Sequence, residues 1–167
     1  MAAGFIHDKL EIKFLILYIT ARVIEPIPFD TVWDLAMCDE GVDYFDFAEC
    51  LSDLVRTEHL TLSADGLYAI TDKGLRNSRI CESSLPYSVR LRCDKNLAAC
   101  NRHLRRKSQV KASTEKRPNG TYTVRLELSD DMGSVMDLRL AIPREEVVLA
   151  MDAIVDPVSL YEPIYSE

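Results

Sequence analysis

The chain has 167 residues, enough for one ordinary domain or two small ones, and 47% of them are hydrophobic, so it can bury a core. Its 27 acidic residues outnumber its 20 lysines and arginines, and the formal net charge of −7 disfavours indiscriminate binding to nucleic acid or to an anionic membrane. The five cysteines include no Cys-x-x-Cys pair, and no basic-then-apolar leader opens the chain, which favours a reduced, cytoplasmic protein.

The first predicted elements are three helices. Residues 8–23 carry apolar side chains at helical spacing behind Asp8, a suitable N-cap, and their apolar run is too short to span a bilayer. Residues 30–38 predict a short second helix with Asp30 as its cap. Residues 43–58 predict a third helix, with apolar side chains on one side and acids on the other.

Residues 60–70 predict a β-hairpin with a three-residue loop that ends at Gly66 in the left-handed conformation. This register places four apolar residues on one face, and a shorter Asp-Gly turn would divide them between two faces. The four are Leu60, Leu62, Tyr68 and Ile70. Thr71 then caps a fourth helix, about 72–81, in whose first turn Gly74 permits the close approach of another backbone.

Three helices, a hairpin and a further helix are the order of a winged helix-turn-helix domain, which we predict over residues 1–83. The stretch LYAITDKG resembles the junction between wing and helix in PadR-like and MarR-like regulators. Ile70 stands at the position of their leucine, and Thr71, Lys73 and Gly74 match.

Four longer stretches resemble an uncharacterised bacterial family that carries a domain of unknown function, whose first half is a winged helix. They are FIHDKLEIKFLILYI, FDTVWDLAMCDEGVDYFDFAECLSDLV, YAITDKGLRN and ESSLPYSVR. The resemblance covers nearly the whole chain and is strongest over residues 5–90. It implies the fold and the broad class, and it supplies no catalytic residues.

The second part of the chain, residues 84–167, predicts a long linker helix followed by a β-hairpin and a helix, so the overall class is α+β. The expected elements are a helix at 85–112, a loop at 113–120, strands at 121–129 and 134–142, and a helix from 143 to about 155. We expect this part to serve dimerisation or sensing.

The long helix carries an apolar seam, whose members recur at three and four residues: Val89, Cys93, Leu97, Cys100 and Leu104. Either this chain's own winged helix and second hairpin cover the seam, or the same helix of a second copy does, as in PadR-like proteins. Because a lone hairpin is marginally stable and two-fold homodimers are common, we expect a homodimer that uses this helix.

Basic charge is concentrated on and after the same helix. Residues 90–117 contain ten lysines and arginines and two acids: the bases are Arg90, Arg92, Lys95, Arg102, Arg105, Arg106, Lys107, Lys111, Lys116 and Arg117. They predict a surface for nucleic acid or for an acidic partner. The alternative, which we favour slightly, is a solvated face that balances the acidic third helix.

The element order and the charge of the third helix point to different functions. A winged helix usually places its third helix in the DNA major groove, but here that helix offers four acids, Asp43, Asp46, Glu49 and Asp53, and the wing has no lysine or arginine. We predict a homodimeric DNA-binding transcriptional regulator that uses Arg56, Lys73, Arg76 and Arg79. The alternative is a non-enzymatic protein-interaction module that uses the acidic third helix.

No pattern predicts an enzyme, a cofactor or a metal site. Cys100 and His103 could share a helix face, but two ligands fall short of the four of a structural zinc site. Cys50 is expected on the exposed side of the third helix, where nearby acids raise its thiol pKa and blunt its reactivity, although a buried or idle thiol is the simpler interpretation. The carboxylates of that helix have no accompanying glycine loop or nucleophile motif.

Overall fold

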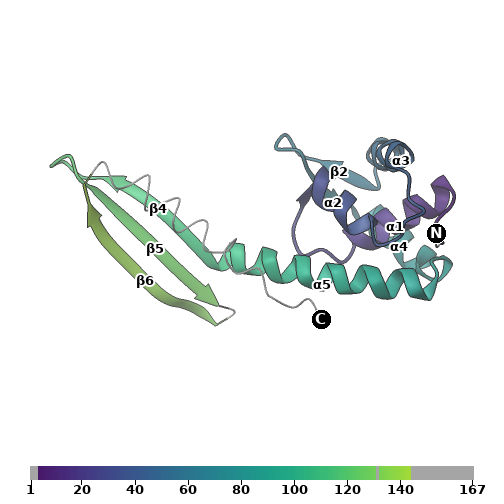
Figure 1. The fold of residues 1–167 in the computed structure, drawn as a ribbon. Helices are drawn as coiled ribbons and strands as arrows, with labels where there is room; N and C mark the ends of the chain where they lie inside the picture. The colour runs from purple at the N-terminus through teal and green to yellow at the C-terminus, as the bar shows by residue number, and fades with distance from the viewer. Residues whose placement is uncertain (1–3, 131, 144–167) are drawn as a thin grey trace. The chain divides into compact units, whose positions relative to one another are not determined.

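The structure is a computed structural model that describes residues 4–130 and 132–143. Their class is α+β, as predicted (Figure 1). The described residues form five α-helices and two antiparallel sheets, each of three strands where a two-stranded hairpin was expected. The chain divides into two compact units, Met1–Arg102 and His103–Glu167. Within the described ranges no helix has the length and apolarity needed to cross a membrane.

The first unit begins with three helices, α1 (Lys9–Thr20), α2 (Phe29–Ala36) and α3 (Tyr44–Arg56). Asp8 caps α1 by accepting a hydrogen bond from Glu11 N at 2.8 Å. The cap predicted for α2 is wrong, because Pro28 occupies the N-cap position and Asp30 lies within the first turn. There its negative charge interacts favourably with the positive N-terminal end of the helix dipole.

Helix α1 lies at the centre of this unit and contacts α2, α3 and α4. Its buried positions are Ile12 and the whole run from Leu15 to Thr20. A helix that is apolar on most sides must be covered on most sides, so α1 organises the helices around it.

The predicted hairpin consists of β2 (Leu60–Leu62) and β3 (Leu67–Ile70), and its register is as expected. Leu60 pairs with Ile70 and Leu62 with Tyr68, and Gly66 has a φ of 77°. A two-residue strand that was not predicted, β1 (Ile27–Pro28), joins the free edge of β3 and gives the strand order β1-β3-β2.

Helix α4 (Asp72–Cys81) has the predicted bounds, and a short 3-10 turn (Glu82–Ser84) follows it. Thr71 caps α4 by accepting from Gly74 N at 3.1 Å. The close approach expected at Gly74 is present, because a Cβ atom built there would lie 2.2 Å from the carbonyl oxygen of His59. The wing and α4 are therefore joined at backbone contact distance.

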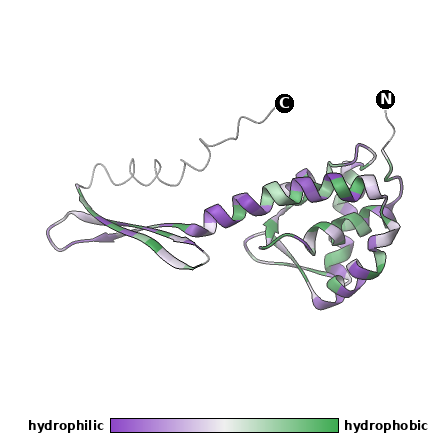
Figure 2. Ribbon diagram, turned by 90° about the horizontal axis from the view of Figure 1, so that it is seen from below, coloured by the Kyte–Doolittle hydropathy of each residue, from purple (hydrophilic) through white to green (hydrophobic). Residues whose placement is uncertain are grey.

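Helix α5 (Tyr87–Gln109) ends three residues earlier than expected, and its last turns are mostly hydrophilic (Figure 2). Its early members Val89, Cys93 and Leu97 are buried within the first unit. Tyr18 Oη donates to Asp94 Oδ1 at 2.7 Å, which adds a polar contact between α1 and α5. The first unit thus includes the first turns of α5 in addition to residues 4–83.

The second unit contains the strands β4 (Val110–Lys116), β5 (Tyr122–Asp130) and β6 (Gly133–Ile142), in that spatial order. The predicted hairpin is β5–β6. The loop expected at 113–120 is wrong for its first residues, because β4 pairs with β5 along its full length and occupies an edge that would otherwise lack partners. The helix and tail expected after Pro143 lie outside the described residues.

Candidate nucleic-acid interface

The outward side of α3 carries a stripe of four residues at helical spacing: Phe45, Glu49, Ser52 and Arg56. All four are exposed, and Phe45 reaches 79% exposure. The opposite side of the helix holds the buried residues Phe47, Leu51 and Leu54. The helix therefore presents one contiguous surface away from the core, which we call the α3 stripe.

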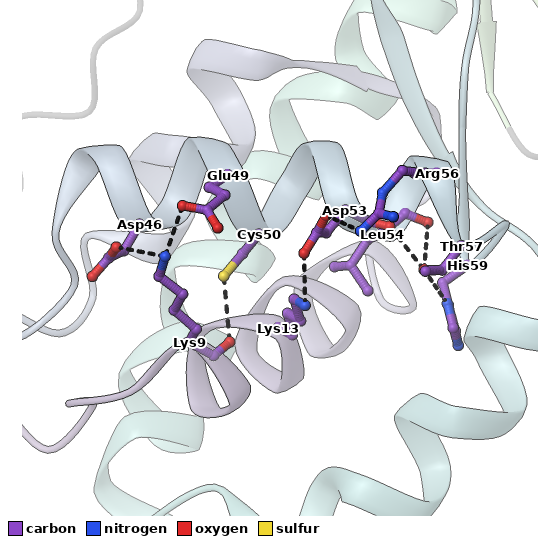
Figure 3. A network of polar contacts seen from close by, with 10 residues as sticks. All are labelled: Lys9, Lys13, Asp46, Glu49, Cys50, Asp53, Leu54, Arg56, Thr57 and His59. Atoms are coloured by element: carbon purple, nitrogen blue, oxygen red, sulfur yellow. Dashed lines mark hydrogen bonds and ion pairs between the residues drawn. The ribbon is translucent and has the colours of Figure 1, made fainter.

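The acids of α3 are held by lysines of α1 (Figure 3). Lys9 Nζ lies 2.7 Å from Glu49 Oε2 and 3.4 Å from Asp46 Oδ1. Lys13 Nζ lies 3.1 Å from Asp53 Oδ2. The hydrogen bond to Glu49 is the main reason why the pKa of Lys9 is raised.

Two further contacts involve the acids of this surface. Arg56 Nη2 lies 2.7 Å from Asp53 Oδ1, and this hydrogen bond, followed by that of Lys13, lowers the pKa of Asp53. Asp43 caps α3 by accepting hydrogen bonds from the backbone N–H groups of Phe45 and Asp46. The acids that the sequence presents as a bare negative face are therefore each engaged within the chain.

Cys50 does not lie where it was predicted. Its side chain is buried between α3 and α1, and its thiol donates to the carbonyl oxygen of Lys9 at 3.3 Å. Burial is the main cause that raises its pKa, and the nearby acids are minor. This buried and protonated thiol matches the structural alternative stated above and not a surface redox sensor.

The end of α3 and the start of α4 form a polar corner. Lys73 Nζ donates to the carbonyl oxygen of Thr57 at 2.7 Å, directly after Arg56. The ring of His59 lies between Thr57 Oγ1 at 2.8 Å and Asn77 Nδ2 at 2.7 Å. Burial and then the charge of Lys73 lower the pKa of His59, which favours its neutral form in this corner.

The structure brings Arg56 and Lys73 to this corner, whereas Arg76 and Arg79 are exposed further along α4. The β2–β3 hairpin that adjoins the corner exposes Thr61, Leu62 and Ser63 and carries no lysine or arginine. This surface therefore consists of the α3 stripe, whose charged residues form ion pairs within the chain, and of the cations Lys73, Arg76 and Arg79 at its margin.

Comparison with known proteins places this arrangement in a family. The profile of the domain of unknown function DUF4364 matches residues 12–159. The chain belongs to the DUF4364 family.

Two curated relatives match over short stretches. The RNA polymerase sigma-G factor of Clostridium acetobutylicum is 68% identical over 28 residues, which are 17% of this chain and 11% of that protein. The RNA polymerase sigma-G factor of Bacillus subtilis is 49% identical over 39 residues, 23% of this chain and 14% of that protein. The DUF4364 chain therefore spans only a small part of the curated relatives that it matches, and no solved structure matches it.

The basic residues predicted on the long helix of this DUF4364 protein have different surroundings. Arg92 Nη2 lies 2.9 Å from Asp39 Oδ2, and Arg90 Nη1 lies 3.9 Å from Glu82 Oε1. Charge balance within the chain therefore accounts for Arg90 and Arg92. Lys95, Arg102, Arg105 and Arg106 are exposed.

The described part of the second unit is basic, although the whole of residues 103–167 has eleven acids and nine lysines and arginines. Its described residues, 103–130 and 132–143, include eight lysines and arginines and four acids, a net charge of +4. On the polar face of the sheet, Arg125 forms ion pairs with Asp137 at 2.7 Å and with Glu127. Unlike Arg125, the bases Arg105, Arg106, Lys107 and Lys111 lie at the end of α5 and the start of β4.

Over the early part of α5, the apolar seam is covered by the same chain, which is the first of the two alternatives given above. Val89, Cys93 and Leu97 are covered by the first unit of the same chain, and Cys100 and Leu104 are half-buried. A contact with a second copy through α5 would involve the later positions and stays a prediction. Among the residues that the structure describes, no cluster of three or more potential ligands is placed to hold a metal ion.

Sequence reasoning missed the lysines that neutralise α3, because they come from another helix. Lys9 and Lys13 are four residues apart, so they share a face of α1. Their spacing matches Asp46, Glu49 and Asp53 on α3, and this pattern could have suggested the pairing of the two helices.

Proposed function

We propose that this DUF4364 protein is a winged-helix DNA-binding protein that regulates transcription, with α3 in the major groove and the β2–β3 hairpin as the wing. The observation that carries the proposal is the pairing of Asp46, Glu49 and Asp53 with Lys9, Lys13 and Arg56. This pairing reduces the repulsion that phosphates would otherwise meet at the α3 stripe.

The side chains of the stripe suit contact with base edges. Ser52 can donate or accept a hydrogen bond, and Phe45 offers an apolar surface of the kind that meets a thymine methyl group. Arg56 can leave Asp53 for a guanine or a phosphate because its side chain is 75% exposed. Lys73, with Arg76, would supply backbone contacts that position the helix.

The short matches to two RNA polymerase sigma-G factors agree with a role related to transcription. They cover 14% or less of those proteins, so they support the class of function and no particular site. The position of α3 and the wing provides the structural part of the argument.

The regulator would act as a homodimer, which would allow two copies to read two half-sites. The apolar face of the second unit favours this assembly, because Met136, Leu138 and Leu140 of β6 are 40% to 47% exposed. Sedimentation of the full chain should give the mass of a dimer, and Leu138→Asp should give a single chain. Ala141→Asp, on the other face of β6, is the control.

A DNA titration tests the proposal. Fluorescent duplexes tiled over promoter regions of the source genome are titrated to about 10 μM protein at about 50 and 200 mM salt. Binding should be salt-sensitive, and Arg56→Glu should weaken it about tenfold or more, since a good base contact is worth about 1–3 kcal/mol. Lys95→Glu on α5 is the matched charge reversal and should have a smaller effect.

The same titration separates this proposal from a protein contact through the acidic side of α3. Lys13→Glu leaves Asp53 to Arg56 alone and adds a negative charge beside the α3 stripe. DNA binding should then fall, whereas a basic protein partner would bind this variant more tightly. Absence of salt-sensitive binding at the highest protein concentration rejects the DNA-binding function.

A further inference from the structure

The polar face of the sheet in the second unit carries a hollow with a volume of about 230 Å³. All three strands of this sheet, β4, β5 and β6, contribute to its lining. The lining residues are Ser113, Thr114, Glu115, Thr123, Arg125 and Arg139. Because they all belong to the second unit, the hollow is separate from the α3 stripe and from the proposed DNA contact.

Two arginines in this hollow are direct neighbours across the sheet. Arg125 of β5 lies opposite Arg139 of β6 on one side and opposite Ser113 of β4 on the other, so the three residues form one row. Like charges that lie directly opposite each other on neighbouring strands destabilise a sheet. Asp137 and Glu127, in the next row, compensate part of this charge. Asp137 lies 2.7 Å from Arg125 Nη2 but 3.7 Å from Arg139 Nη2.

Both guanidinium groups keep donors that an anion can use. Arg125 donates to Asp137 through Nε and Nη2, which fixes the plane of its guanidinium, and within the described residues its Nη1 makes no hydrogen bond. The side chain of Arg139 is 64% exposed, and its contact of 3.7 Å with Asp137 is longer than a hydrogen bond. Adjacent guanidinium groups with free N–H donors suit a phosphate group, which accepts such donors in pairs.

The next row of the same face offers different chemistry. It contains Glu115 of β4 and Thr123 of β5, which lie opposite each other. Arg117 Nε donates to Thr123 Oγ1 at 2.6 Å, so the hydroxyl proton of Thr123 can be donated to a ligand. The carboxylate of Glu115 only accepts hydrogen bonds, so it repels an anion but suits the hydroxyl group of a ligand.

We propose that this hollow binds a small phosphate monoester that carries hydroxyl groups. The phosphate oxygens accept hydrogen bonds from Arg125, Arg139 and the hydroxyl of Ser113, and a hydroxyl of the ligand donates to Glu115. Inorganic phosphate makes the first set of contacts without the second and places its charge near the Glu115 carboxylate, so it should bind more weakly. The site does not depend on the proposed DNA-binding function.

Calorimetric titration of the full chain with glycerol 3-phosphate tests the proposal, with inorganic phosphate and glycerol as the comparison probes. Glycerol 3-phosphate should saturate one site per chain and bind more tightly than inorganic phosphate, and glycerol should give no measurable binding. Arg139→Gln should weaken the binding of glycerol 3-phosphate about tenfold or more, because it removes hydrogen bonds between charged groups.

Two further variants separate a site from general attraction to basic residues. Lys111→Gln removes a charge from the same face of β4 but outside the hollow, so it should weaken binding much less than Arg139→Gln. Glu115→Ala should bring the affinities for glycerol 3-phosphate and inorganic phosphate closer together. Circular dichroism checks that each variant is folded.

Three results would overturn the proposal or a part of it. Absence of saturable binding of glycerol 3-phosphate would reject the site. Equal effects of Arg139→Gln and Lys111→Gln would show attraction to the basic surface in place of a site. Equal affinities of the unchanged protein for the two phosphates would reject the contact assigned to Glu115.

Discussion

Asp39 and Arg92 form an ion pair between a carboxylate side chain that is 0% exposed and a guanidinium that is 48% exposed, at 2.9 Å. The carboxylate also accepts backbone hydrogen bonds from Phe5 at 3.0 Å, Ile6 at 3.1 Å and Gly41 at 3.1 Å. One buried charge thus joins the N-terminal segment, the connection between α2 and α3, and α5. A buried charge is tolerated only with such a set of partners.

Arg92→Ala should lower the free energy of unfolding by about 1–3 kcal/mol, because it leaves the Asp39 carboxylate buried with its backbone donors alone. Urea unfolding, followed by circular dichroism, measures the change. Lys95→Ala on the same helix is the matched control and should stay within about 0.5 kcal/mol of the unchanged protein. Equal effects of the two variants would contradict the role assigned to the ion pair.

The stability should also depend on pH through Asp39. Burial acts to raise the pKa of Asp39, but the hydrogen bonds from Phe5, Ile6 and Gly41 and the charge of Arg92 outweigh it, so the pKa is lowered. A lowered carboxyl pKa contributes stability that is present above the unfolded value of about 3.9 and is lost as the pH falls through the folded value.

Thermal unfolding between about pH 2 and pH 6 measures this dependence. In Asp39→Asn, the Tm should be lower at pH 6 and should fall less steeply on acidification than in the unchanged protein. Parallel curves for the two proteins would show that Asp39 does not contribute to the acid dependence.

Local patterns gave the parts of the fold that the sequence predicted well. The register of β2–β3 could be predicted because it is the one that places four apolar residues on the same face. The start of α4 could be predicted from the cap at Thr71. The pairing of α1 with α3 and the burial of Cys50 depend on contacts about 40 positions apart in the chain. The periodicity of apolar residues within one helix or strand gives no information about contacts between elements so far apart in the chain.

The strand β4 shows a different limit. Val110, Ala112 and Thr114 alternate with polar residues, which is a strand pattern, but these residues directly follow a long helix with the same basic composition. The helical period and the strand period overlap over a few residues, and only the pairing with β5 decides between them. Buried Asp39 carries no sequence signal, because it resembles the acids of a solvated turn.

Gly74→Ala should destabilise the first unit by about 1–3 kcal/mol or more, because the added Cβ would lie 2.2 Å from the carbonyl oxygen of His59 and the backbone would have to move. Gly66→Ala is the comparison. It has no atom within 4 Å of the added Cβ, but its φ of +77° costs a residue with a side chain about 1 kcal/mol. Chemical unfolding should rank Gly74→Ala as the more damaging change, and the reverse order would mean that wing and α4 are not in backbone contact.

Substitution of Phe45 and of Phe47, both on α3, should affect DNA binding and stability separately. Phe47 is fully buried and packs against the rings of Phe29 and Trp33, with ring centroids 5.6 Å and 5.0 Å apart, so Phe47→Ala should lower the free energy of unfolding by about 3–5 kcal/mol. Phe45 is 79% exposed, so Phe45→Ala should change stability by less than about 1 kcal/mol. In the proposed function Phe45→Ala nevertheless weakens DNA binding, because it removes an apolar contact from the α3 stripe. A folded Phe45→Ala protein that binds DNA as tightly as the unchanged chain would remove Phe45 from the proposed interface.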